Sequence, residues 1–244
     1  MKKALLICGV LVAFAAPAMA GGLNFAWGLG CWPENPVSNA AFACNTNGGS
    51  DAATGSFTVS NNQPEFVGIE AVIDLQAASP TLPAWWQFFN PGSCRQSSLS
   101  ASADFLGSPN TSCTDPWTGL GAGGIAAYQT IATSPAVPNG LPNAARIKIA
   151  FALADPSPLT AGTEYYGLRI VINHAKTVGT GACAGCSTPV CLALNSIKSA
   201  QRTGPSELVS APLANQTLSY QNALSCLATP ASNHTWGQIK SLYR

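Results

Sequence analysis

Apolar side chains recur at every second position in several stretches of this chain, and this period of two limits what the chain can fold into. The clearest stretch is 66–75, and residues 145–153 and 165–173 repeat the pattern. Successive side chains of a β-strand point to opposite faces, so each stretch predicts a strand with one buried face. In the first stretch the buried set is Val67, Ile69, Ala71, Ile73 and Leu75.

Shorter segments extend this pattern to an all-β fold. Further strands are predicted at 23–27, 57–59, 85–89, 190–197 and 218–220, and Pro, Gly and Asn cluster at 90–92, 138–142 and 155–158, where we expect turns. No long stretch of helical period separates these strands. We therefore predict an antiparallel two-sheet sandwich, of immunoglobulin-like or jelly-roll type.

The first twenty residues have the features of a bacterial signal peptide. Lys2 and Lys3 precede an apolar run over 4–16, and Ala18 and Ala20 form an A-x-A cleavage site. The run is too short to span a bilayer comfortably, so we expect no transmembrane anchor. The predicted organisation is a signal peptide over 1–20, one β-sandwich over 21–228 and a tail over 229–244, in a protein exported to the periplasm, cell surface or medium.

The tail differs from the rest of the chain because its apolar residues follow helical spacing. Trp236, Ile239 and Tyr243 share one face of a predicted short helix, and Thr235 with Gln238 has the spacing of a capping box. This helix either packs on its own domain or serves as a docking or sorting peptide.

Eight cysteines remain after the predicted cleavage, and an even number in an exported chain indicates four disulfides. Two pairs, Cys31 with Cys44 and Cys94 with Cys113, would each close one short loop, and these pairings are favoured. Three pairings stay open for the others, which are Cys183, Cys186, Cys191 and Cys226.

The C-x-x-C spacing of Cys183 and Cys186 has two alternative interpretations. With Cys191 and either His174 or His234 it would supply zinc ligands, and alone it would resemble a redox-active pair. A redox site of this kind starts a helix within a βαβ unit, whereas this segment lies between two predicted strands. Structural disulfides are the favoured interpretation.

The net charge of the chain argues against nucleic acid as a partner, and the context of one glycine-rich motif argues against a dinucleotide cofactor. Charged residues make up 9% of the chain, and without Lys2 and Lys3 its net charge is −1, which gives no basis for nucleic-acid binding. Residues 119–124 match the dinucleotide-binding pattern G-x-G-x-x-G. However, no apolar strand precedes them and no acidic residue follows at the required distance, so a loop is predicted and no cofactor is expected.

A hydrolase is weakly supported. Neither His174 nor His234 adjoins a nucleophile motif, and packing or capping roles are expected for both. Glu70 and Asp74 share a strand face and would suit a glycosidase.

Those two carboxylates have a simpler interpretation. Arg146 and Lys148 occupy the polar face of another predicted strand. Cross-strand ion pairs between the two strands are therefore the preferred expectation.

Two weaker ligand candidates complete the set. Asn45, Asn47 and Asp51 offer oxygen atoms around a glycine turn, as a calcium site would, although only one of them is a carboxylate. Trp85 and Trp86 are adjacent, so on a strand one would enter the core and the other would be free to stack on a sugar ring. The alternative to the calcium site is a simple Asn-Gly turn. The alternative to the sugar-stacking site is burial of both indoles.

Several segments also resemble a family of exported, cysteine-rich bacterial β-domain proteins that has no established activity. The resemblance spans most of the chain after residue 20 and implies export and a β-domain, without any catalytic residue. It is carried by residues 23–28 (LNFAWG), 42–47 (FACNTN), 67–74 (VGIEAVID), 83–88 (PAWWQF), 164–171 (EYYGLRIV) and 183–191 (CAGCSTPVC).

Three functions remain, in order of preference. The first is a non-catalytic structural or interaction protein at the cell surface or outside the cell, for which a surface protein and a glycan are both candidate partners. The second is a carbohydrate-binding module, and the third is a secreted hydrolase.

Overall fold

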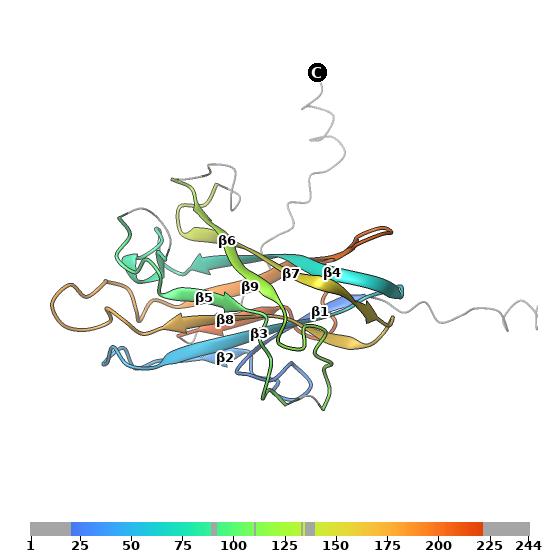
Figure 1. Cartoon of the computed structure of the whole chain (residues 1–244). Coiled ribbons are helices and arrows are strands. Elements are labelled where there is room, and N and C mark those ends of the chain that lie inside the picture. The colour runs from blue at the N-terminus through green and yellow to red at the C-terminus, as the bar shows by residue number, and fades with distance from the viewer. Residues whose placement is uncertain (1–20, 89–91, 110, 133, 135–139, 222–244) are drawn as a thin grey trace, which may run out of the picture.

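The computed structural model describes residues 21–88, 92–109, 111–132, 134 and 140–221, and these residues form two sheets packed face to face (Figure 1). The predicted signal peptide, the tail over 229–244 and Cys226 lie outside the described residues. Antiparallel pairing dominates both sheets. The predicted antiparallel two-sheet sandwich is confirmed.

The smaller sheet has four strands. Its order is β1 (Gly22–Trp27), β3 (Ser50–Thr58), β8 (Glu164–Asn173) and β5 (Leu99–Ser102). β3 and β8 pair along their full length, with one bulge after Gly55.

The larger sheet has seven strands. β4 lies near its middle between β9 and β7, and a two-residue strand, β2, pairs parallel with β11 at one edge. The order is β2 (Asn39–Ala40), β11 (Thr217–Tyr220), β9 (Val190–Gln201), β4 (Gln63–Ala77), β7 (Ala144–Leu159) and β6 (Ala122–Thr130), with β10 (Glu207–Val209) paired to β9.

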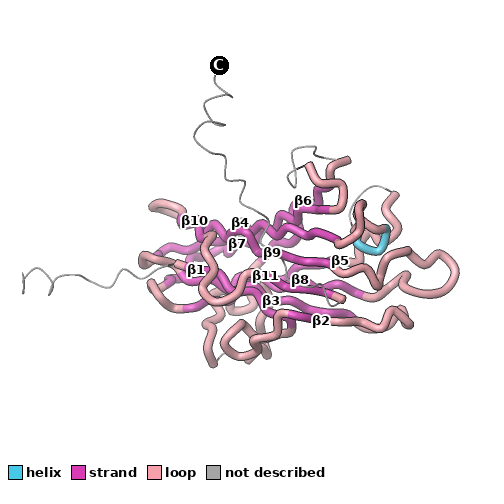
Figure 2. The backbone as a smooth tube through the Cα atoms, turned by 180° about the vertical axis from the view of Figure 1, so that it is seen from behind, coloured by secondary structure: helices cyan, strands magenta, loops and turns pink. Residues whose placement is uncertain are grey.

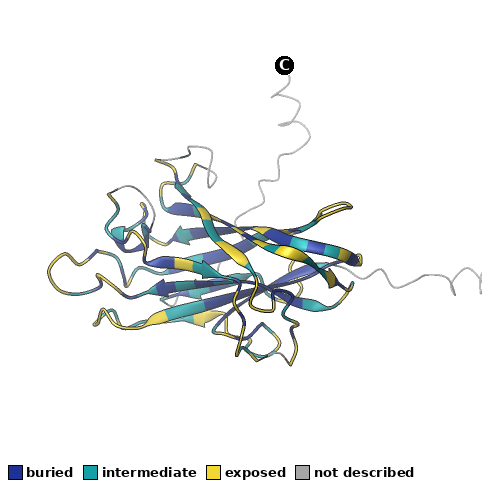
Figure 3. Cartoon of the chain, viewed as in Figure 1, coloured by how far each residue is buried: buried dark blue, intermediate teal, exposed yellow. Residues whose placement is uncertain are grey.

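The core fills the space between the sheets. The predicted apolar face of β4 is buried from Ile69 to Leu75, and the inner positions of β8 are buried opposite it. Val67 is only partly buried and Phe66 is buried instead, because the register shifts between Phe66 and Gly68. Figure 3 shows the dark buried segments concentrated where the two sheets face each other. Removal of this apolar surface from water is the main force that holds the sheets together.

The prediction of a strand at 85–89 is wrong. Ala84–Trp86 forms a short 3-10 helix, η1, which is the small cyan segment in Figure 2. Adjacent side chains on a strand point to opposite faces, whereas this turn places both Trp85 and Trp86 in the core, with ring centroids 4.9 Å apart.

The prediction of a turn at 155–158 is also wrong, because these residues belong to β7. The pairing of β6 with β7 reaches only Ala152, so beyond that residue one edge of β7 has no partner strand. Proline cannot donate a ladder hydrogen bond, and it is tolerated where an edge is free. Pro156 and Pro158 therefore continue the strand.

Part of the 119–124 loop prediction also changes. Ala122, Gly123 and Gly124 begin β6, so the glycine-rich pattern runs into an edge strand and not into a helix. Among the described residues, no helix has the length and apolar character needed to cross a bilayer.

One of the two predicted cross-strand ion pairs is confirmed. Asp74 lies opposite Arg146 in the β4–β7 register, and the guanidinium contacts both carboxylate oxygens at 2.6 and 2.7 Å. Lys148 instead lies opposite Val72, and Glu70 pairs with Lys198 of β9 at 3.4 Å. The sequence predicted which strand faces carry the charged residues. The strand register determines which of these residues pair.

The Arg146 pair should contribute measurably to stability, because Asp74 is only 6% exposed. R146A leaves a buried carboxylate without its bidentate partner, and we expect the free energy of unfolding to fall by about 1–3 kcal/mol. Chemical denaturation at neutral pH measures this difference.

K198A is the matched control, since Lys198 and Glu70 are both largely exposed. An exposed pair is worth about 0–1 kcal/mol. Equal losses in the two variants would show that the burial of Asp74 has no energetic consequence.

Candidate functional site

Three disulfides join segments that are far apart in the sequence. The bonds are Cys31–Cys113, Cys44–Cys186 and Cys94–Cys183, and Cys191 is also disulfide-bonded. The predicted short-loop pairs, Cys31 with Cys44 and Cys94 with Cys113, are wrong. Closeness along the chain did not identify the pairs because the sandwich topology brings distant connections together.

Two of these bonds meet at one end of the sandwich. The chain crosses between the sheets there three times, and the described residues of these crossings are 41–49, 78–88 with 92–98, and 174–189. Cys44 and Cys94 each bond to a cysteine of the last crossing. These three segments form the left end of Figure 1, and we name them the crossing loops.

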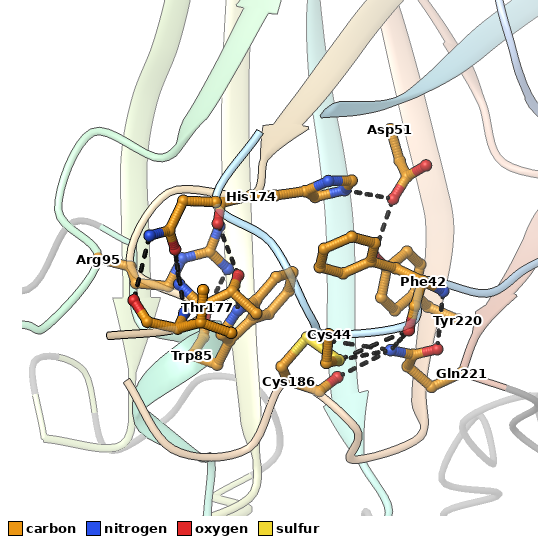
Figure 4. Close-up of a disulfide and its surroundings, with 12 residues drawn as sticks. Phe42, Cys44, Asp51, Trp85, Arg95, His174, Thr177, Cys186, Tyr220 and Gln221 are labelled. Atoms are coloured by element: carbon orange, nitrogen blue, oxygen red, sulfur yellow. Dashed lines mark hydrogen bonds and ion pairs between the residues drawn. A yellow bond between two sulfur atoms is a disulfide. The ribbon is translucent and has the colours of Figure 1, made fainter. Parts of the chain in front are cut away.

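A histidine and an aspartate meet inside the crossing loops (Figure 4). His174 follows β8 and is 5% exposed, and its Nε2 lies 2.9 Å from Asp51 Oδ2. The same carboxylate oxygen accepts a 2.8 Å hydrogen bond from the hydroxyl of Tyr220. The ring of Phe42 stacks on the imidazole with centroids 3.6 Å apart.

The contacts of His174 give it a structural role. Its Nδ1 lies 3.0 Å from the carbonyl oxygen of Gly48, so both ring nitrogens have partners within the protein. Burial, reinforced by the hydrogen bond to Asp51, raises the pKa of the Tyr220 hydroxyl. A general base needs a nitrogen that can reach substrate. The contacts among His174, Asp51 and Tyr220 connect the end of β8 to β3 and β11. Neither imidazole nitrogen is directed outward.

A buried arginine lies beside this group. Arg95 is 0% exposed, and its guanidinium carbon lies 3.5 Å from the centroid of the Trp85 ring. It donates to the carbonyl oxygens of Trp85 at 2.9 Å, of Ala175 at 3.0 Å and of Asn173. Burial lowers the pKa of Arg95 to about 10. Backbone carbonyls and an aromatic face solvate this cation, and it binds the second crossing loop to the third.

The predicted calcium ligands take part in the same network. Asn47 Oδ1 accepts hydrogen bonds from the backbone N–H groups of Thr177 and Val178, at 2.7 and 3.0 Å. Asp51 Oδ2 is used by His174 and Tyr220, and Asn45 is exposed. The oxygens at Asn47 and Asp51 are acceptors for the protein's own donors, so this geometry favours the turn over a cation site.

The predicted sugar platform is contradicted by burial. Trp85 and Trp86 are both 0% exposed, and the indole N–H of Trp85 donates to Thr177 Oγ1 at 3.0 Å. Two adjacent indoles enter the core because η1 replaces the expected strand. Neither ring offers a face to a ligand.

The cysteines that were considered as zinc ligands are consumed by disulfides. Zinc binds thiolates, whereas Cys183 and Cys186 are both oxidised. Sulfur atoms of Cys31 and Cys113 lie within 4.8 Å of a Glu164 oxygen, but these two cysteines are also bonded to each other.

A second set of cross-linked loops is formed by the loop after β1 and the loop between β5 and β6. Glu34 accepts hydrogen bonds from the backbone N–H groups of Thr111 and Ser112 and from the hydroxyl of Tyr166. Burial raises the pKa of Glu34, but these hydrogen bonds outweigh it and the net pKa is lowered. Together with Cys31–Cys113, they fix the loop after β1 to the loop between β5 and β6.

Three exposed leucines stand on these fixed loops. Leu29 is 56% exposed, and Leu106 and Leu120 are each 71% exposed. Arg169 donates to the carbonyl oxygens of Leu29 and Asp104, at 3.1 and 3.2 Å. We name residues 28–38 and 103–121 the leucine loops, and their blue and green traces lie together in the lower part of Figure 1.

A groove of about 610 Å³, lined by both polar and apolar side chains, lies at the end of the sandwich opposite the crossing loops. Amide side chains of Asn61, Asn62, Gln63 and Gln201 line it, together with Glu207. Its lining contains no aromatic residue.

Sequence reasoning missed the residues that organise the crossing loops, namely Phe42, Arg95 and Tyr220. One signal was available for Arg95, because it follows Cys94 directly in a chain with few charges. A cation beside a disulfide cysteine is a candidate for burial, but its carbonyl partners could not be inferred without the topology.

Comparisons with known proteins give little further information. No protein-family model matches the chain, and no curated protein is similar to it. One solved structure, from Corynebacterium diphtheriae and described as a candidate membrane-anchored protein, is 11% identical with a TM-score of 0.26. The match covers 85% of this chain and 37% of the other, so this chain corresponds to little more than a third of that structure.

Replacement of Arg95 should destabilise the fold strongly. R95A and R95K each leave carbonyl oxygens of the crossing loops without donors and weaken the contact with Trp85. We expect the free energy of unfolding to fall by about 2–4 kcal/mol in each variant, measured by chemical denaturation of the oxidised protein.

R202A is the matched control, because Arg202 is half exposed and lies 4.0 Å from an exposed Asp155. Its loss should stay within about 1 kcal/mol. Full stability in R95K would contradict the account, because lysine lacks the planar fork that reaches several carbonyls.

Proposed function

We propose that this chain is a non-catalytic interaction domain of an exported protein, acting at the cell surface or outside the cell. The observation that carries the proposal is the exposure of Leu29, Leu106 and Leu120 on loops held by a disulfide and by Arg169. Apolar side chains on a preorganised surface lose little entropy when a partner covers them. The partner class is a protein with a complementary apolar surface.

Export is supported by cysteine chemistry. Disulfides persist in oxidising compartments and are rare in the cytosol. Three bonds here join segments at least 82 residues apart. The signal-peptide pattern over residues 1–20 predicts the same route.

The non-catalytic part of the proposal is supported by the contacts of the reactive side chains. His174, Asp51 and Glu34 each bind protein donors or acceptors. Asp74 is held by Arg146 and lies away from Glu70, which pairs with Lys198. A hydrolase would need one of these groups to face a substrate cleft.

Sugar binding is the second candidate, and the amide side chains of the groove favour it. Amide side chains are suitable donors and acceptors for hydroxyl groups, and four of them line this groove. The location differs from the earlier expectation at Trp85 and Trp86, which are buried.

Site-specific photocrosslinking tests the protein-binding proposal. A photoreactive phenylalanine analogue replaces Leu106 or Leu120 in the full chain, expressed in the cells that naturally produce it. We expect one discrete adduct from each position, whose yield falls at least several-fold when excess wild-type chain competes. An L29S/L106S/L120S competitor should be ineffective.

Ile131 is the matched control position, because it is 36% exposed and follows the end of β6 that is far from Leu120. Adducts of equal yield at Ile131 would refute a specific surface at the leucine loops. Saturable binding on a glycan array that is lost in N62A and Q201A would instead support the groove and the sugar-binding candidate.

A further inference from the structure

The first described residue lies at the point where the predicted signal peptide ends. Gly21 and Gly22 follow the A-x-A pattern at Ala18–Ala20, and Gly22 begins β1. We propose that cleavage after Ala20 creates a binding site for the new chain terminus, in which the α-ammonium group of Gly21 docks against Ser60 and the carboxylate of Glu207. This inference rests on the export that we propose above.

Hydrogen bonds already place the nitrogen of Gly21 in this site. It donates to Ser60 Oγ at 2.8 Å, and the backbone N–H of Ser60 donates to Glu207 Oε1 at 2.7 Å. A Cβ built on Gly21 would lie 3.0 Å from that same carboxylate oxygen. Since a Cβ is about 2.5 Å from its backbone nitrogen, that nitrogen lies at most about 5.5 Å from the carboxylate oxygen, a gap that a small movement of the freed terminus can close.

Side chains at the first two positions would be crowded by neighbouring atoms. A Cβ on Gly21 would lie 2.9 Å from Ser60 Oγ and 3.0 Å from the carbonyl oxygen of Thr58. A Cβ on Gly22 would lie 2.8 Å from the Cβ of Leu213. Glycine at both positions therefore lets the start of the chain lie close to Ser60, Thr58 and Leu213.

The carboxylate of Glu207 has no competing cation in the structure. None of the ion pairs within the described part of the chain includes Glu207. Its other oxygen lies 3.4 Å from the amide nitrogen of Gln63, a neutral donor. The residues that approach from the β3–β4 turn, Ser60, Asn61 and Asn62, are uncharged. A cation supplied by Gly21 would be the first to neutralise this partly buried charge.

Cleavage changes the chemistry of one atom. Hydrolysis of the Ala20–Gly21 peptide bond adds the hydroxyl of water to the Ala20 carbonyl carbon and one proton to the Gly21 nitrogen. The free amine then takes up a further proton from solvent. A single neutral donor becomes a cation with three donors, which can bind Ser60 Oγ and Glu207 at the same time.

The ion pair makes a signed prediction for pH. An α-amino group ordinarily has a pKa of about 7.7–8.0, and a neighbouring carboxylate favours its charged form and raises that pKa. The stabilisation is therefore fully present below the ordinary pKa and is lost as pH rises through the raised value.

The experiment measures the pKa of the Gly21 amine directly. The signal peptide is replaced by the recognition sequence of a protease that leaves glycine as the first residue, and the amine of the oxidised protein is titrated by nitrogen-15 NMR. We expect a pKa about one unit above the ordinary value. In E207Q it should return to the ordinary value, while E70Q, on the exposed face of β4, should leave the raised value unchanged.

Stability supplies a second readout. N-terminal acetylation of the cleaved protein should lower its urea midpoint at pH 6 and have no effect in E207Q. An amine pKa that is equal in wild type and E207Q would overturn the proposal even if export is correct. Conversely, N-terminal sequencing of the chain exported by its own cells would show a start other than Gly21 if the processing premise is wrong, and that result would overturn the docking of Gly21 whatever the titration shows.

Discussion

The connections between the two sheets are the constraint on which the rest of this structure depends. Apolar burial holds the sheets face to face, but the chain must cross between them, and three crossings meet at one end. Cys44–Cys186 and Cys94–Cys183 fix these crossings to one another over separations of 142 and 89 residues. Because long loops lose much entropy when closed, such bonds restrict the unfolded chain strongly.

This arrangement explains why residues that suggest chemistry have structural roles. His174 contacts Gly48 of the first crossing loop and Asp51 of β3, and backbone carbonyls solvate the charge of Arg95. Arg95 thus supplies donors where irregular backbone is buried and needs partners. The exposed surface is apolar at the leucine loops, and amide side chains line part of the groove.

Much of the fold could be predicted from the sequence, because the period of two depends only on local geometry. It placed the inner face of β4 and identified Asp74 as facing a cationic strand. The disulfide partners and the 3-10 turn at Trp85 could not be predicted, since they depend on which connections meet in space. For the same reason the sequence could not show that Asn47 accepts a hydrogen bond from Thr177 of the third crossing loop, or that Asp51 accepts one from Tyr220 of β11.

The central claim is that the crossing loops are bonded to one another and not closed on themselves. Proteolysis of the alkylated, non-reduced protein followed by mass spectrometry tests it most directly. The account predicts linked peptides that contain Cys44 with Cys186, Cys94 with Cys183 and Cys31 with Cys113. Linked peptides that join Cys31 to Cys44 and Cys94 to Cys113 would contradict it.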